Sequence, residues 1–341
     1  MPDAATADEL LTEHDPSFKR YVSQRRARFE KLFGAQEHKQ LLDRAEQALK
    51  IAYARFALRH GTWGKDLHDY HNESHAVEIL SGRIDYLCDR AGPERLPPRD
   101  WVLLTLFGAM HDLRQRETPD PDRLVGANES ASIEECHRIL DAVGFDREAD
   151  KDTYADLEMM IAGSTFNTAP KKNPHVTPAE AATSAGALAP LLVLQLDQEK
   201  PDWRDDPELR HRVRLTLIAS DLDTANVSEP ILKLSKSAVR LCKEIEYRCG
   251  RDLGTESAVP VFNFLTNGQE AYFFDLHQFD SELGTEVLGA MKEKNAPVVT
   301  ALVQHIRDKY AGGPGEDVTG REIIDEFMHK TSELSGRAAK R

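Results

Sequence analysis

The sequence lacks the cysteine spacing of a disulfide-linked protein. Its 341 residues include 4 cysteines, at positions 88, 136, 242 and 249, and no two of them form a C-x-x-C pair. With 40% hydrophobic residues the chain can bury one large core or two modest ones. We therefore interpret the cysteines as buried thiols and not as a crosslinking framework.

Basic residues are too few for a nucleic-acid-binding surface. The chain has 44 Lys and Arg against 58 Asp and Glu, so its formal charge is −14. No stripe of Lys and Arg alternates with aromatic residues, and a surface of this charge repels phosphate backbones. We expect no nucleic-acid partner.

Long apolar runs and a basic leader are also absent. The first segment, "MPDAATADELLTEHD", has acidic residues where a secretory signal needs a basic region followed by an apolar run. No later stretch approaches the roughly 20 apolar residues that span a bilayer. We expect no membrane association and a cytoplasmic location.

Alternating strand patterns are missing, and helical periodicity takes their place. The segments 18–33, "FKRYVSQRRARFEKLF", and 40–60, "QLLDRAEQALKIAYARFALRH", are amphipathic, and Gly61 follows the second as a helix cap. Pro, Gly and Asp break the chain at short intervals, and no repeat is visible. The sequence therefore predicts an all-α protein.

Two strongly apolar segments end in acidic residues. Residues 101–112, "WVLLTLFGAMHD", end in His111 and Asp112, and residues 213–223, "VRLTLIASDLD", end in Asp221 and Asp223. A carboxylate at the inner end of a buried helix costs several kcal/mol unless a cation or hydrogen-bond donors compensate it. A divalent metal ion would compensate both segments at once.

A pair of histidines four residues apart, in "DYHNESHAVEIL" (residues 69–80), completes a candidate ligand set. The candidate ligands are His75, His111, Asp112 and Asp221. Imidazole and carboxylate together suit zinc, iron or manganese, and carboxylates with water suit magnesium. A purely structural alternative stays open, in which these groups are hydrogen-bonded polar residues of the core.

The order H…HD…D resembles the metal-dependent phosphohydrolases of the HD superfamily. More narrowly, "YHNESHA" followed by "HD" looks like the catalytic domain of the class I cyclic nucleotide phosphodiesterases. The resemblance covers about residues 50–310. It implies one compact, multi-helix catalytic domain, with residues 1–49 as an N-terminal helical extension packed on it and residues 311–341 as a C-terminal helix and basic tail.

Further motifs extend the resemblance. "SIEECHRIL" is similar to a family helix whose glutamate lies near the water that bridges two metal ions, which implies a catalytic role for Glu135. "ASDL" resembles the family's "ADL" and implies that Asp221, and not Asp223, is the last ligand. "NGQEAYFF" resembles a segment in which a glutamine binds the purine and an aromatic ring stacks on it, implying Gln269 and Tyr272.

The family mechanism implies two divalent ions that hold a bridging hydroxide. Zinc, iron or manganese would occupy the first site and magnesium or manganese the second, with Asp112 between them. If Asn72 caps the helix, His71 lies just before it and His75 in its first turn. The resemblance then implies that His75 binds metal, that His71 protonates the leaving 3′ oxygen, and that Tyr70 helps to wall the substrate pocket.

Three positions depart from the family pattern. Gln115 stands where the family has a second histidine after "HD", "GST" with Ser164 replaces "TDM", and Thr224 replaces the asparagine after "ADLS". The first metal site is therefore expected to be complete and the surroundings of the second to be altered.

The sequence thus predicts a phosphodiesterase that hydrolyses a 3′,5′-cyclic nucleotide to the 5′-monophosphate. Two alternatives stay open: an HD-type phosphohydrolase acting on another nucleotide or phosphate ester, and a noncatalytic metal-binding sensor. Whether the early helices form a homodimer is also left open.

Overall fold

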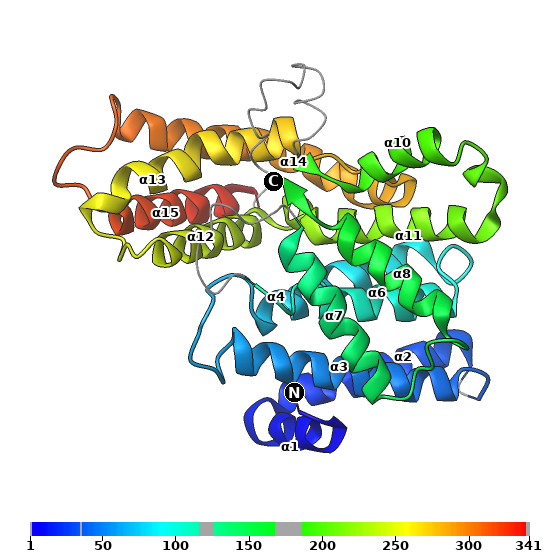
Figure 1. Ribbon diagram of the computed structural model, residues 1–341. Coiled ribbons are helices and arrows are strands. Elements are labelled where there is room, and N and C mark those ends of the chain that lie inside the picture. Colours follow the sequence, from blue (N-terminus) through cyan, green and yellow to red (C-terminus); the bar gives the residue numbers. More distant parts are fainter. Residues whose placement is uncertain (1, 35, 116–125, 168–185, 339–341) are drawn as a thin grey trace. The chain divides into compact units, whose positions relative to one another are not determined.

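The computed structural model describes residues 2–34, 36–115, 126–167 and 186–338. Helices joined by turns make up these residues, apart from one short antiparallel pair between β1 (Phe166–Asn167) and β2 (Gly186–Ala187) (Figure 1). The predicted all-α class is confirmed. Within the described residues, no helix has both the length and the apolar character needed to cross a membrane.

Packing divides the chain into two compact units, which are described separately. The described residues up to Asp223 form the first unit, and those from Thr224 onward form the second. The sequence analysis placed domain boundaries after residues 49 and 310. These differ from the division between the two units after Asp223, and they stay predictions. Residues 339–341, the end of the predicted basic tail, lie outside the described residues.

The first unit is built from helices around one central apolar helix. Its elements are α1 (Ala4–His14), α2 (Pro16–Phe33), α3 (Lys39–Arg59), α4 (Glu73–Val77), η1 (Glu78–Ile84), α5 (Asp85–Ala91), α6 (Pro98–Met110), α7 (Ala127–Ala142), α8 (Lys151–Gly163), α10 (Ala189–Glu199), η2 (Trp203–Asp205) and α11 (Pro207–Thr224). The bounds of α2 and α3 agree closely with the segments 18–33 and 40–60, which the sequence predicted to be helices.

The central element is α6, in which every residue from Asp100 to Met110 is buried. It packs against α3, α8 and η1. Its one buried acidic residue, Asp100, is neutralised by His211 at 2.8 Å and Arg214 at 3.3 Å. The apolar pattern of residues 101–110 therefore places the helix end that carries His111 inside the unit.

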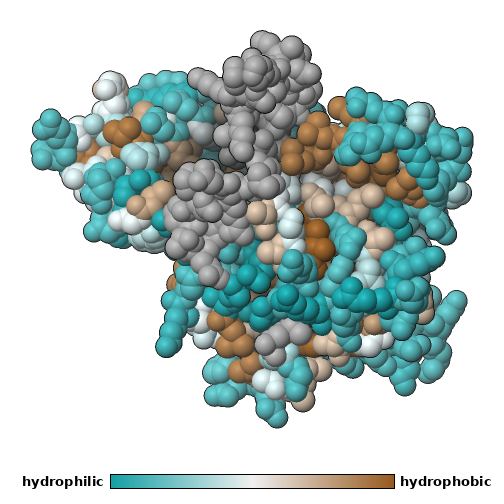
Figure 2. All heavy atoms as spheres, in the orientation of Figure 1, coloured by the Kyte–Doolittle hydropathy of each residue, from teal (hydrophilic) through white to brown (hydrophobic). Residues whose placement is uncertain are grey.

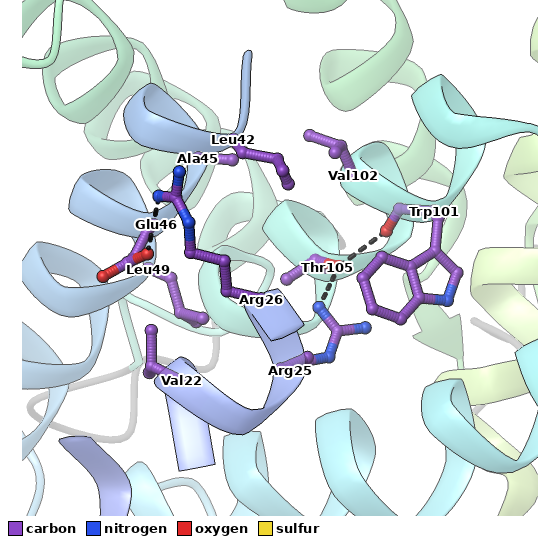
Figure 3. A pocket seen from close by; sticks show the side chains of 10 residues that line it. All are labelled: Val22, Arg25, Arg26, Leu42, Ala45, Glu46, Leu49, Trp101, Val102 and Thr105. Carbon is purple, nitrogen blue, oxygen red and sulfur yellow. Dashed lines mark hydrogen bonds and ion pairs between the residues drawn. The ribbon is translucent and has the colours of Figure 1, made fainter. Parts of the chain in front are cut away.

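Buried arginine side chains also join the helices of this unit. Beside the cavity among α2, α3 and α6, Arg25 donates a hydrogen bond to Thr105, and its guanidinium lies 4.2 Å from the centroid of the Trp101 ring (Figure 3). Its Nε also pairs with Asp85 Oδ1 at 2.9 Å. Arg25 thus joins α2 to α5 and α6.

The surface over α10 is more apolar than most of the visible face (Figure 2). Leu194 is 51% exposed, and Leu191, Leu192 and Val193 are only partly buried. This short helix therefore contributes little to the core of the first unit.

Gly108 allows α6 to approach η1 closely. A Cβ atom at this position would lie 2.7 Å from Ile84 Cδ1, 3.2 Å from Ile79 Cγ2 and 3.3 Å from Leu80 Cδ2. We expect Gly108→Ala to lower the free energy of unfolding by about 1–3 kcal/mol, because the added methyl group overpacks this contact. Urea unfolding followed by circular dichroism measures the change.

Gly289 provides the matched control for this prediction. It lies inside the helix α14 (Glu282–Lys309), and a Cβ there would meet no atom within 4 Å. Gly289→Ala should therefore stabilise the protein by about 0.5–1 kcal/mol through helix propensity alone. Equal effects of the two substitutions would contradict the close contact at Gly108.

The second unit is also helical. Its elements are η3 (Ala225–Ser228), α12 (Ile231–Arg248), η4 (Thr255–Ser257), α13 (Ala258–Asn263), η5 (Phe264–Gly268), η6 (Ala271–Leu276), α14 and α15 (Gly320–Ala338). One buried cluster, which includes Leu265, Ile306 and Ile323, joins α12, α13, α14 and α15. The side-chain amide of Asn295 donates to the carbonyls of Val227 and Glu229, both at 2.8 Å, and fixes the start of this unit on α14.

Candidate metal centre

The first ligand position is set by a capped helix start. Asn72 is the N-cap of α4, and its side chain accepts a hydrogen bond from Ser74 N at 2.9 Å, as the sequence predicted. The amide of Asn72 also donates to His68 O at 2.6 Å. His75 therefore lies in the first turn of α4, where its side chain is 1% exposed.

The second and third positions lie at the C-terminal end of α6. His111 is the C-cap residue, and its ring Nδ1 lies 3.2 Å from Phe107 O. Donation from Nδ1–H to this carbonyl leaves Nε2 as the atom that can bind a metal ion, the arrangement usual for metal-binding histidines. Asp112 follows directly, so the apolar helix ends in two ligand-type side chains.

The structure brings His75, His111 and Asp112 together with Asp223. His111 Nε2 lies 3.2 Å from both Asp112 Oδ2 and Asp223 Oδ1. His75 Nε2 lies 3.6 Å from Asp112 Oδ2 and 3.8 Å from Asp223 Oδ1. The four ligand atoms lie within 4.8 Å of one another.

The fourth member differs from the sequence-based assignment, which chose Asp221. Both aspartates belong to α11, but successive helical residues are turned by about 100°, so residues two apart point about 200° apart. Asp221 is buried and is not a member of the group. The apolar pattern alone could not decide between them, because each aspartate follows the same apolar segment, and the choice of Asp221 rested on the resemblance of "ASDL".

The spacing of the four atoms suits a metal ion. Nitrogen and oxygen ligands about 2.0–2.2 Å from one tetrahedral ion are about 3.4 Å apart. The four His–Asp pairs lie at 3.2–3.8 Å. Both histidines are buried, whereas the side chains of Asp112 and Asp223 are 17% and 19% exposed. The group is therefore open to water on its carboxylate side.

The charges of the four groups depend on one another. Burial lowers the pKa of His75, against the effect of the nearby carboxylates. Burial also opposes the charged form of His111, but Asp112 and Asp223 outweigh it and raise the pKa of His111 well above its usual value. Burial disfavours both carboxylates, yet His111 holds the pKa of each below its usual value. A divalent ion would therefore displace a proton from His111.

Gln115 and Asn128 support Asp112. The side-chain amide of Gln115 donates to Asp112 Oδ1 at 2.8 Å, and Asn128 Nδ2 donates to Gln115 Oε1 at 3.1 Å. Asp112 Oδ1 is thereby fixed, while Oδ2 faces the histidines. Gln115 stands where the resembled family has a histidine, and in this chain it orients a ligand.

Glu129, at the start of α7, is an acidic residue that the sequence analysis did not select. Burial raises the pKa of its carboxyl group, and the charges of Asp112 and Asp223 raise it further. No short motif around it signalled this position; only folding brings it near the centre.

The predicted catalytic residues, His71 and Glu135, and the predicted substrate-binding residue Tyr70 lie at different places in the first unit. Tyr70 is buried and its ring centroid is 4.4 Å from that of His75 and 4.8 Å from that of His71. His71 is half-buried and close enough for its charge to lower the pKa of Asp112. Glu135 instead pairs with Arg55 at 2.5 Å and is not a member of the ligand group.

Two of the three predicted substrate-binding residues, Gln269 and Tyr272, belong to the second unit. The hydroxyl of Tyr272 donates to Asn226 Oδ1 at 2.9 Å and lies 3.3 Å from Thr224 O. Gln269 lines a mainly apolar cavity that includes Leu234 and Val299.

In the first unit, the hydroxyl of Ser164 donates to Ile161 O at 2.9 Å, so this residue of the "GST" segment bonds to its own helix.

Arg83 holds the backbone at the end of α11, where Asp223 lies. Its side chain is fully buried, and Nη1 donates to Leu222 O at 3.0 Å and to Asp223 O. It projects from η1, a π-helical stretch that continues α4. Arg83 therefore connects the helix of His75 to the last turn of α11.

We expect Arg83→Gln to weaken metal binding by roughly 10- to 100-fold, because Asp223 loses the contacts that fix its backbone. Arg25→Gln is the matched control, since it removes another buried guanidinium that touches none of the four ligands. Titration with a metal indicator gives the affinities, and thermal unfolding gives the stabilities. Equal affinities of the two variants would show that Arg83 only stabilises the fold.

Comparison with known proteins found no family model that matches the chain and no curated protein that matches its sequence. The geometry of the site is therefore the main evidence for function. It shows that His and Asp side chains are grouped in a way that could hold metal ions.

Proposed function

We propose that this protein is a metal-dependent phosphohydrolase of the HD superfamily, and that it hydrolyses a 3′,5′-cyclic nucleotide to the 5′-monophosphate. The observation that supports this best is the group His75, His111, Asp112 and Asp223. It follows the sequence order H, then HD, then D. The two histidines are buried, and the two carboxylates face an open side.

Taking Asp223 as the last ligand changes the match to the family at two places. In the family, an asparagine stands three residues after the last metal-binding aspartate. Counting from Asp221, this place is held by Thr224, but counting from Asp223 it is held by Asn226. One of the three departures from the family pattern is thereby removed, while the match of "ASDL" to the family's "ADL" is lost.

The donor set fits divalent ions, with zinc, iron or manganese at a first site and magnesium or manganese at a second. Two such ions would lower the pKa of a water molecule and neutralise charge at phosphorus. Asp112 would supply Oδ2 as a ligand, since Gln115 holds Oδ1 and leaves Oδ2 facing the histidines.

His71 is the proposed general acid. It precedes the N-cap of α4, is half-buried, and is not one of the four grouped residues. During hydrolysis the water molecule loses one proton to solvent, its oxygen joins phosphorus, and the bond from phosphorus to the 3′ oxygen breaks. His71 gives its proton to that oxygen, which leaves as a hydroxyl group.

Gln269 and Tyr272 are proposed to recognise the base of the nucleotide. Gln269 has the donor and acceptor needed for a purine edge, and the hydroxyl of Tyr272 is held by Asn226, which fixes the direction of its ring. The substrate is a small nucleotide, and neither a nucleic acid nor a membrane is required.

Ser164 favours the two alternatives to cyclic nucleotide hydrolysis. The family has an aspartate at this position, which orders water at the second ion. The hydroxyl of Ser164 instead donates a hydrogen bond to Ile161 O. A weaker second site would suit a phosphohydrolase acting on another phosphate ester, or a noncatalytic metal-binding sensor.

Product analysis tests the proposal. The protein, loaded with manganese or magnesium, is incubated with cyclic AMP and with cyclic GMP, and the products are separated by chromatography. We expect the 5′-monophosphate of at least one substrate, and none from the Asp112→Ala variant. If neither is hydrolysed by protein that retains stoichiometric metal, the cyclic nucleotide assignment is wrong and the alternatives above apply.

A further inference from the structure

The connection between α3 and α4 brings two buried histidines to one carboxylate. His60 is the C-cap residue of α3 and is 0% exposed, and His68 is 2% exposed. The backbone N–H of His68 donates to His60 O at 2.9 Å, and the ring centroids lie 4.4 Å apart. Asp66, with 45% of its side chain exposed, lies between them and solvent.

The distances in this group resemble those between ligands of one metal ion. His60 Nδ1 lies 3.6 Å and His68 Nε2 lies 3.5 Å from the same oxygen, Asp66 Oδ2. Both distances are longer than the 2.7–3.2 Å usual for an N–H···O hydrogen bond. They match the separation of about 3.4 Å between ligands of one tetrahedral ion with bonds of about 2.0–2.2 Å. All three ligand atoms lie within 4.8 Å of one another.

We propose that His60, Asp66 and His68 form a second, separate metal site that binds a zinc ion. Two imidazoles and one carboxylate are a ligand set for transition metals and not for magnesium or calcium. Zinc is favoured because ligands of an octahedral ion with bonds of about 2.1 Å would be only about 3.0 Å apart. The exposed side of Asp66 leaves room for water as the fourth ligand.

The site of His60, Asp66 and His68 is called the loop site below. It shares no residue with the group of His75, His111, Asp112 and Asp223. Its role is structural, because it joins the end of α3 to the segment that leads to α4. The same segment is held by Glu73, whose carboxylate accepts from Thr62 N at 3.1 Å and from Thr62 Oγ1 at 2.6 Å. Zinc at the loop site would order the residues just before Tyr70 and His71.

One hydrogen bond connects the two sites and must change when zinc binds. The backbone N–H of Gln115 donates to His60 Nε2 at 3.3 Å. When Nδ1 binds an ion, the proton of the neutral ring moves to Nε2, which can then no longer accept this bond. The side chain of Gln115 holds Asp112, so occupancy of the loop site should alter metal affinity at the other group.

Counting zinc in full-length variants tests this inference. In the His75→Ala, Asp223→Ala double variant, which lacks two ligands of the first group, we expect one zinc ion per chain after equilibrium dialysis. Adding Asp66→Asn should remove this ion with little risk to folding, because Asp66 is partly exposed. Adding His137→Ala, which breaks a histidine–carboxylate pair elsewhere, should leave the zinc in place.

Cobalt provides a second measurement on the same proteins. Four-coordinate Co²⁺ at the loop site should give the strong visible absorption of that geometry in the double variant, and Asp66→Asn should abolish it. The inference is wrong if the folded double variant binds no zinc, or if zinc remains after Asp66→Asn. Neither result depends on hydrolysis, so the proposed function is tested separately.

Discussion

Replacing Asp223 with Ala should remove the metal ion from the group formed with His75, His111 and Asp112. Asp223 Oδ1 lies 3.2 Å from His111 Nε2, and no other carboxylate of the described residues joins this group besides Asp112. Losing a ligand should cost more than the roughly 100-fold typical of losing a supporting residue. Dialysis against a weak chelator followed by metal analysis measures the loss of metal, and a hydrolysis assay measures the loss of activity that accompanies it.

Asp221→Asn is the control for this experiment. Asp221 is two residues earlier on the same helix and is buried, and the amide keeps the size of its side chain while replacing one acceptor oxygen with an NH2 donor. This variant should retain metal and activity. Loss of metal from Asp221→Asn together with its retention in Asp223→Ala would restore the sequence-based assignment and contradict the geometry of α11.

Replacing His71 with Ala should leave metal content unchanged and lower the turnover of a cyclic nucleotide by roughly 10²- to 10⁴-fold. This is the range expected when a general acid is lost. Steady-state kinetics with the metal-loaded variant measures the change in kcat. The physical reason is that the 3′ oxygen is a poor leaving group unless it receives a proton as its bond to phosphorus breaks.

A substrate with a better leaving group separates this role from a structural one. Bis(p-nitrophenyl) phosphate releases a stable phenolate that needs no proton, so His71→Ala should hydrolyse it nearly as fast as the unchanged protein. An equal loss of turnover on both substrates would contradict the proton-transfer role. It would indicate that His71 supports the packing of Tyr70 and His75 instead.

Part of the site follows from local patterns in the sequence. The Asn cap places His75 in the first turn of its helix, with its side chain directed into the core. The apolar helix before His111 and Asp112 places its own end in the core as well. His75, His111 and Asp112 could therefore be predicted to meet. The all-α class follows in the same way from the helical periodicity and from the lack of alternating patterns.

Other parts of the site depend on tertiary packing and could not be predicted. Asp221 and Asp223 follow the same apolar segment, and only the rotation of α11 about its axis decides which one faces His111. Gln115 reads in the sequence as a lost histidine, yet in the structure its amide orients Asp112. His60 and His68 meet only because the loop between them folds back, as the bond from His68 N to His60 O shows.

The most direct test of the central claim is anomalous diffraction from crystals of the zinc- or manganese-loaded protein, recorded on both sides of the metal absorption edge. We expect a peak bounded by His75 Nε2, His111 Nε2 and the carboxylates of Asp112 and Asp223. A protein that binds metal in solution but shows no peak at this position would contradict the account. The group would then be a set of hydrogen-bonded core residues, and not a metal centre.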